Sequence, residues 1–446
     1  MIKKPALILL AIAIILGGTV YYFDWKRGSS EKTDTFKRAF NFQASDISAM
    51  ILSHPSQPSE PAIHFVKRGD SWQIVDPVET NADQSTVDGI ADQVAGAEIT
   101  ATEPGTPDRL KAFGLDPPQA SLELDLANGS KHTLLLGSKT FDNASVYAIV
   151  DGGQQVGLLP ELLSASTARN LDTLRDRAVL HFESGDTASF SLKNSSGEIE
   201  AAKQDDHWKM KKPIETFASS DSVDSLLQAI SGANMVSVAS EKSDDLAQYG
   251  LTSPAITFTD TNSKGAQYTL LVGKKDGDNY FARDVSRPMI FRINADLYNK
   301  LSQKFADLRD KKVLHFDSID VQQLELHNSN GVITIGRKKD APDDWTFSSP
   351  PDQKGKAASD WKIVDPLTGL SAEEVIDHPP PAIVSSLANP AVTAIITTKN
   401  GKTMTLKISK ASGDFVYAQA SDAPALYKLK KDVLDTLSLK ASDVAQ

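Results

Sequence analysis

Two histidines stand at matching places in this chain of 446 residues, and imidazole is a side chain that readily binds metal or transfers protons near neutral pH. His181 and His315 are each enclosed in a Leu-His-Phe segment. In an extended strand the leucine and phenylalanine point one way and the histidine the other, which favours an exposed or interdomain histidine. We expect no recurring carboxylate partner or second histidine beside them. We therefore predict a structural role rather than that of a ligand or base.

An arginine–aspartate pair also recurs, and such a pair could bind a charged ligand. The two copies are Arg175-Asp176 and Arg309-Asp310, and each follows a leucine. The same residue types commonly form salt bridges at helix ends and at junctions between domains. We favour this second interpretation and predict that the two pairs are junction or interaction residues.

Tryptophan opens a third recurring motif, Trp-x4-Pro, at Trp72 and again at Trp208. Indole rings could stack on sugars, which would indicate glycan binding. An apolar residue follows two positions later in each motif, Ile74 in the first and Met210 in the second. This spacing favours packing of a hairpin against a core, so the two rings are predicted to be structural or interaction residues.

The remaining candidates for chemistry are weaker. Residues 276–279 suggest a calcium loop, but they lack the spacing and closing glutamate of an EF-hand, and a turn is expected. Residues 373–378 hold three carboxylates and a histidine, which we interpret as the solvated face of a helix ended by the prolines at 379–381. The sequence has no nucleophile elbow, His-Glu-x2-His, phosphate loop or dinucleotide motif. We predict a non-enzyme with no catalytic residue, cofactor or metal.

Composition excludes several classes of protein. Apolar residues make up 40% and charged residues 24%, which excludes a wholly disordered chain. The net charge is −11, so there is no basic excess to neutralise phosphates, and we expect no nucleic-acid binding. The absence of cysteine excludes thiol nucleophiles, disulfides and thiolate metal sites. At roughly 150 residues per domain, the length predicts about three domains.

The N-terminus predicts a membrane anchor. Residues 5–23 are uncharged and follow two lysines, and as a helix they would be about 28 Å long, close to the thickness of a bilayer core. We predict a cytoplasmic N-terminus at residues 1–4, a single transmembrane helix at 5–23 in the lipid bilayer and a linker at 24–37. A cleaved signal peptide is the alternative interpretation. The bulk of the chain is then expected in the periplasm or extracytoplasmic space.

An internal repeat organises the rest of the chain. Leu174–Phe182 recurs as Leu308–Phe316 with seven of nine positions identical, and the two Trp-x4-Pro motifs begin 136 residues apart. We predict three tandem units at residues 38–176, 177–310 and 311–446, of which the third is divergent.

Alternating and helical patterns within a unit predict its elements. Leu122, Leu124 and Leu126 alternate before an Asn-Gly turn at 128–129, which indicates a hairpin. Residues 87–94 carry apolar side chains at helical spacing. The fold class predicted is α+β, a single N-terminal transmembrane helix followed by mainly antiparallel sheet-plus-helix units. In the third unit, residues 359–366 are not expected to form the corresponding helix.

Together these motifs resemble the bacterial domain-of-unknown-function family 4340. The resemblance rests on Trp-x4-Pro, Gly-Leu-x2-Pro, Leu-Leu-x-Gly and Leu-Arg-Asp, in that order, over residues 38–446. It implies an accessory role in the bacterial envelope beside ABC-type permeases or gliding-motility systems, and it supplies no catalytic residues. The favoured function is a membrane-anchored, non-catalytic scaffold at the inner membrane. The alternatives are a glycan-binding module and a hydrolase with scattered carboxylates.

Overall fold

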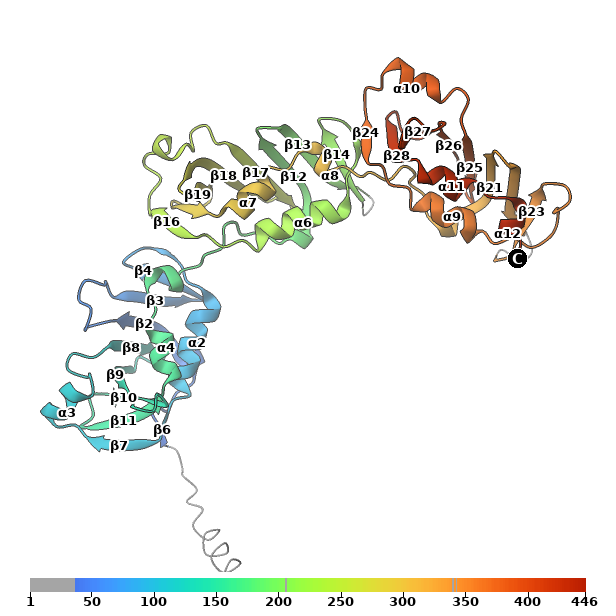
Figure 1. Ribbon diagram of the computed structural model, residues 1–446. Coiled ribbons are helices and arrows are strands. Elements are labelled where there is room, and N and C mark those ends of the chain that lie inside the picture. The colour runs from blue at the N-terminus through green and yellow to red at the C-terminus, as the bar shows by residue number, and fades with distance from the viewer. Residues whose placement is uncertain (1–36, 205–206, 339–340, 342) are drawn as a thin grey trace, which may run out of the picture. The chain divides into compact units, whose positions relative to one another are not determined.

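The computed structural model describes residues 37–204, 207–338, 341 and 343–446 (Figure 1). The predicted anchor at residues 5–23 lies outside the described residues. Among the residues that the structure describes, no helix is long and apolar enough to cross a membrane.

The protein is mostly β, with 43% of residues in strands and 21% in helices, and its strands form four sheets. The predicted α+β class, with its N-terminal transmembrane helix, is therefore wrong. The longest described helices have 12 residues, and several have only four to six. Each large sheet has eight or nine strands. Some edge strands are only two residues long, too short to leave a pattern in the sequence.

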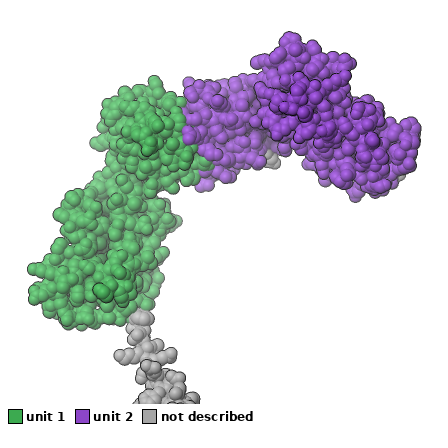
Figure 2. Space-filling model, in the orientation of Figure 1, with its two compact units in different colours: residues 1–182, 229–255, 268–298 green, residues 183–228, 256–267, 299–446 purple. Residues whose placement is uncertain are grey.

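Contacts divide the chain into two compact units, which Figure 2 shows in different colours. The first unit comprises residues 1–182, 229–255 and 268–298, and the second comprises residues 183–228, 256–267 and 299–446. All strands of the first large sheet belong to the first unit, and all strands of the third belong to the second. The strands of the middle sheet are divided between the two units.

The first large sheet is antiparallel, with the strand order β5-β4-β3-β2-β8-β9-β10-β11-β7. Its strands are β2 (Ile47–Ser53), β3 (Ile63–Arg68), β4 (Ser71–Asp76), β5 (Thr80–Asn81), β7 (Ala101–Pro104), β8 (Ala120–Leu126), β9 (Lys131–Lys139), β10 (Ser145–Val150) and β11 (Gln155–Pro160). Its helices are α2 (Gln84–Ala95), α3 (Pro107–Ala112), α4 (Leu162–Thr167) and α5 (Leu171–Leu174). A separate small sheet pairs β1 (Lys37–Arg38) with β6 (Glu98–Ile99).

The second and third large sheets repeat this order. The second sheet runs β15-β14-β13-β12-β17-β18-β19-β20-β16, and the third runs β23-β22-β21-β25-β26-β27-β28-β24 without a counterpart of β5. The strands of the second are β12 (Thr187–Asn194), β13 (Gly197–Gln204), β14 (His207–Lys212), β15 (Thr216–Phe217), β16 (Ser237–Ser240), β17 (Ile256–Asn262), β18 (Gln267–Asp276), β19 (Asn279–Asp284) and β20 (Ile290–Ile293). Those of the third are β21 (Val321–Asn328), β22 (Gly331–Arg337), β23 (Trp345–Ser349), β24 (Glu374–Ile376), β25 (Val392–Thr398), β26 (Thr403–Ile408), β27 (Phe415–Ala420) and β28 (Leu426–Lys430).

Helices accompany these two sheets at matching places in the chain. They are α6 (Ser220–Ser231), α7 (Ala295–Leu301), α8 (Phe305–Leu308), α9 (Trp361–Thr368), α10 (Pro381–Ser386), α11 (Asp432–Leu437) and α12 (Ala441–Val444). The helical spacing predicted at residues 87–94 is confirmed, because α2 buries Val87, Ile90 and Val94. Its N-terminus is capped by Asp83, whose carboxylate accepts a hydrogen bond from the Thr86 amide at 2.9 Å.

Two predictions for the third predicted repeat, residues 311–446, are wrong. A helix does form after Trp345, because α9 buries Ile363, Val364 and Leu367, and this burial outweighs the amide hydrogen bond that Pro366 cannot make inside the helix. The acidic segment at 373–378 is not a helix face, because it contains the edge strand β24, paired with β28. The prolines that follow precede and begin the short helix α10.

The middle sheet has a carboxylate in its core. Asp260 on β17 is fully buried and faces Phe190 on β12. The same register position holds Leu124 in the first sheet and Ile396 in the third. Among the described residues, neither oxygen of Asp260 has a hydrogen-bond partner. Burial raises the pKa of Asp260 to about 6, and the charge of Asp186 acts in the same direction.

We expect Asp260→Leu to stabilise the protein above pH 6. A carboxyl whose pKa is higher in the folded than in the unfolded chain lowers the free energy of unfolding as pH rises. For Asp260 this loss falls between about pH 4 and pH 6 and amounts to roughly 3 kcal/mol. Urea unfolding of the variant and the wild type across this range should show a difference that grows with pH and then levels off. Asp260→Asn is the control, since it removes the charge but keeps a buried polar group. A leucine variant less stable than wild type at pH 7.5 would contradict the prediction.

Candidate functional site

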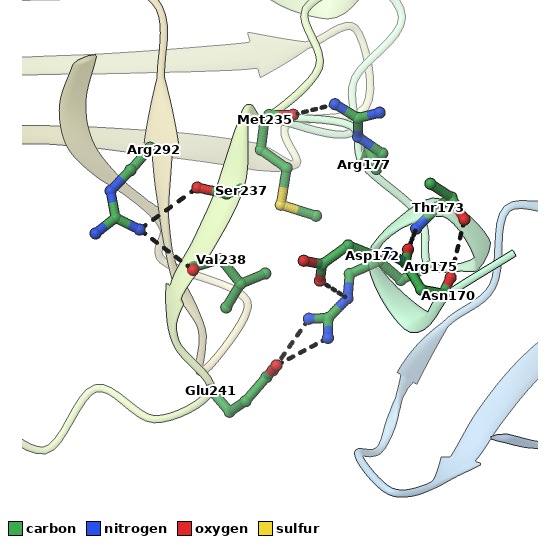
Figure 3. A network of polar contacts seen from close by, with 10 residues as sticks. All are labelled: Asn170, Asp172, Thr173, Arg175, Arg177, Met235, Ser237, Val238, Glu241 and Arg292. Atoms are coloured by element: carbon green, nitrogen blue, oxygen red, sulfur yellow. Dashed lines mark hydrogen bonds and ion pairs between the residues drawn. The ribbon is translucent and has the colours of Figure 1, made fainter. Parts of the chain in front are cut away.

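The first repeated arginine is buried where the first sheet meets the segment after β16. Arg175 follows α5, and its side chain is only 2% exposed. It donates two hydrogen bonds to the carboxylate of Glu241, at 2.8 and 3.2 Å, in the paired geometry favoured between guanidinium and carboxylate (Figure 3). Its Nε lies 3.3 Å from Asp172. The guanidinium is thereby neutralised without access to water.

The second repeated arginine occupies the corresponding place within the second unit and also pairs with an acid. Arg309 follows α8, is 7% exposed and donates a hydrogen bond of 2.7 Å to Asp377. Asp377 directly follows the edge strand β24, as Glu241 follows β16. These two acids are 136 residues apart, the spacing of the sequence repeat. The expectation that Asp377 lies on a solvated helix face is therefore wrong, because its carboxylate pairs with a buried cation.

The outer sheets each lack one half of this pair. The residue after β7, which corresponds to Glu241 and Asp377, is Gly105. The residue after α12, which corresponds to the two arginines, is Ala445, and its bridge to Ala358 matches the bridges of the arginines to Ala82 and Ala218. A carboxylate therefore occurs only where an arginine precedes it. We call the pairs Arg175–Glu241 and Arg309–Asp377 the junction pairs.

A second pair forms beside each junction pair. The Nε2 of His181 lies 2.5 Å from Asp176, and that of His315 lies 3.0 Å from Asp310. The histidines thus have the carboxylate partner that we did not expect from sequence. Burial alone would raise the pKa of Asp176 and of Asp310, but hydrogen bonds from the histidine and from a main-chain amide outweigh it, and the pKa of each lies below its usual value.

The repeated tryptophans lie in the core. Trp72 is fully buried and Trp208 is 2% exposed. Each indole nitrogen donates a hydrogen bond to an aspartate on the neighbouring helix, Asp88 at 2.8 Å and Asp224 at 3.2 Å. Neither ring offers a face on which a sugar could stack.

The third sheet also has a core tryptophan. The main-chain carbonyl of Trp345 accepts a hydrogen bond from the amide of Ala358. The carbonyls of Trp72 and Trp208 accept the corresponding bonds from Ala82 and Ala218, so Trp345 is the counterpart of these two tryptophans. Trp361, by contrast, is 54% exposed on α9.

Comparison with protein families gives two overlapping matches. The model of the domain of unknown function DUF4340 matches residues 72–239 and residues 208–386. The chain belongs to the DUF4340 family. No match to a curated protein was found. Each DUF4340 match begins at a buried tryptophan and contains one Leu-Arg-Asp junction.

The DUF4340 chain also has a cavity that sequence analysis missed. It measures about 490 Å³ and lies against the first sheet, between the loop after β2 and the end of α4. A buried histidine lines it, His54, whose Nε2 lies 2.8 Å from the Thr167 carbonyl and whose Nδ1 lies 3.2 Å from Glu60. Within the described residues, no group of three or more His, Asp or Glu side chains could hold a metal ion.

We expect Arg175→Ala to destabilise the protein by about 3–5 kcal/mol, because a half-buried carboxylate loses its partner and a large buried side chain is removed. Arg309→Ala should have a similar effect. Arg109→Ala is the control, since Arg109 pairs with Glu103 at the surface. This substitution should lower the free energy of unfolding by less than about 1 kcal/mol. Urea unfolding checks all three, and equal effects of Arg175 and Arg109 would contradict the assignment.

We expect Asp176→Asn to lower stability at pH 7 by about 1–3 kcal/mol. Because the pKa of Asp176 is lower in the folded chain, its contribution is present above about pH 4 and is lost as pH falls through the folded value. The difference from wild type should therefore shrink in acid. Asp125→Asn removes an exposed partner of Lys131 and serves as control. A difference that stays constant down to pH 3 would refute the assignment.

Proposed function

We propose that this DUF4340 chain is a non-catalytic accessory protein of the bacterial envelope that presents fixed surfaces to partner proteins. The partner class is an ABC-type permease or a gliding-motility complex. The single observation that carries the proposal is the junction pair, built twice from the same two positions. A buried ion pair is weak evidence for stability but a good device for specifying one arrangement of the groups that it joins.

Main-chain bonds support the same interpretation. The amide of Asp176 donates to the carbonyl of Asn81 at 2.9 Å, and the amide of Met235 donates to Arg177 at 2.8 Å. At the other junction, the amide of Asp310 donates to the carbonyl of Phe217 at 3.0 Å. Each connection therefore runs as bonded backbone rather than as a free linker. Such a connection suits a protein that must hold neighbouring surfaces in one register.

The location and the number of units are part of the proposal. The uncharged run at residues 5–23 supports a place at the inner membrane, with the bulk of the chain on the extracytoplasmic side. We further propose that residues 311–446 are a third, divergent unit of the family, supported by the strand order of the third sheet.

Deletion of residues 5–23 should move the chain from the membrane fraction to the soluble fraction of bacterial cells. The measurement is immunoblotting of fractionated cells, with a variant lacking residues 24–35 as the control that shortens the chain without touching the apolar run. A deleted chain that stays with the membrane would contradict the proposed attachment.

Partner docking can be tested on the same material. The tagged full-length chain, purified from gently solubilised membranes, should recover a permease, and Glu241→Gln with Asp377→Gln should reduce that recovery severalfold. Glu103→Gln is the matched surface control. Circular dichroism should show that both variants are folded. Recovery that is unaffected by the double substitution would exclude a role for the junctions, and the absence of any partner would exclude docking.

A further inference from the structure

The first sheet departs from the other two at one loop. Residues 54–62 join β2 to β3 and contain three prolines, whereas residues 195–196 and 329–330 make the same connection as two-residue turns. A long loop on a rigid sheet is where binding residues are most often found. Because the sheets otherwise share one strand order, the added loop is not needed to build the sheet.

The residue that begins this loop also departs from the pattern. At the end of the corresponding strands, Asn194 and Asn328 each donate through one amide nitrogen to two carbonyls at the end of the closing helix, at 2.9–3.0 Å. His54 occupies this place in the first sheet and bonds to one such carbonyl, that of Thr167. Its other ring nitrogen is directed to Glu60 of the added loop. The histidine thus fastens the loop to the helix end and forms part of the cavity wall.

The charges that line the cavity are not balanced. Glu60 is held by His54, and Lys139 pairs with Glu161. Arg169, which also lines the cavity, forms no ion pair with any residue that the structure describes. The residue of the second sheet that corresponds to Arg169 is Gln303, whose carbonyl is the second one bound by Asn194. One guanidinium is therefore left to bind an anion from outside.

The rest of the lining suits a hydroxylated ligand. Side-chain amides and hydroxyls come from Gln57, Gln119, Ser138 and Ser164. The one ring among the lining residues is the imidazole of His54, which is held between the Thr167 carbonyl and Glu60. Amides and hydroxyls can both donate to and accept from hydroxyl groups, and arginine pairs with carboxylates. The volume of about 490 Å³ lies within the range of small-molecule sites.

We propose that this cavity is a binding site for a small hydroxylated carboxylate, with Arg169 as the partner of the carboxylate. The proposal is independent of the envelope function. Its ligand class follows from the one lining cation without an ion pair among the described residues, and from the side-chain amides and hydroxyls around it.

The test uses two probes on the full-length chain. D-Gluconate carries a carboxylate and hydroxyls, and sorbitol has the same carbon skeleton without the charge. Isothermal titration at constant ionic strength should show saturable binding of gluconate and at least about tenfold weaker binding of sorbitol. Arg169→Gln, which installs the side chain of the second sheet, should weaken gluconate binding by about tenfold.

Two further variants make the outcome decisive. His54→Asn installs the residue of the other sheets, so the sheet should fold, but it releases Glu60 beside the site and should also weaken gluconate binding. Lys111→Gln removes an exposed cation on α3, outside the cavity, and should leave binding unchanged. Equal binding of sorbitol and gluconate, or equal losses in the Arg169 and Lys111 variants, would overturn the proposal. Failure of gluconate to bind at all would overturn it too.

Discussion

A guanidinium that is removed from water must meet its counter-charge at the place where it is buried, and this requirement governs both junctions. Arg175 and Arg309 are fixed at the ends of short helices, so each acid must arrive at one defined point. Glu241 and Asp377 do so because each directly follows an edge strand whose pairing sets its position. A shift of one residue in that pairing would turn the carboxylate away. The junction pair and the register of the edge strand therefore depend on each other.

The distribution of the pair along the chain supports this argument. Gly105 and Ala445 stand at the two corresponding positions where the described residues supply no opposite charge from another sheet. A buried charge without a partner is strongly unfavourable, so the acid and the arginine are expected to occur together. The same reasoning explains why Asp260 stands out, because it introduces a carboxylate where the other sheets have Leu124 and Ile396.

Local patterns in the sequence predicted what depends on near neighbours. The hairpin around Asn128 and the buried stripe of α2 follow from alternation and helical spacing, and the structure contains both. The fold class was wrong because short edge strands carry too few residues to show a period. The acids of the junction pairs lie 66 and 68 residues from their arginines, and no local rule connects them. The partners of His181 and His315 are only five residues away, but this separation matches neither helix nor strand spacing, so the contacts could not be predicted from the sequence.

Comparison among the three sheets then separates folding from other roles. Where all three sheets agree, as at the core tryptophans, the side chains are buried, and the indole nitrogens of Trp72 and Trp208 donate hydrogen bonds inside the protein. Where the first sheet alone differs, at His54 and the loop that follows, the added residues line a cavity and add nothing to the sheet. The chain carries a net charge of −11, so an anion is not drawn to this protein by its overall field. Any anion that binds there must be held by a local charge, and Arg169 is the residue at the cavity that supplies one.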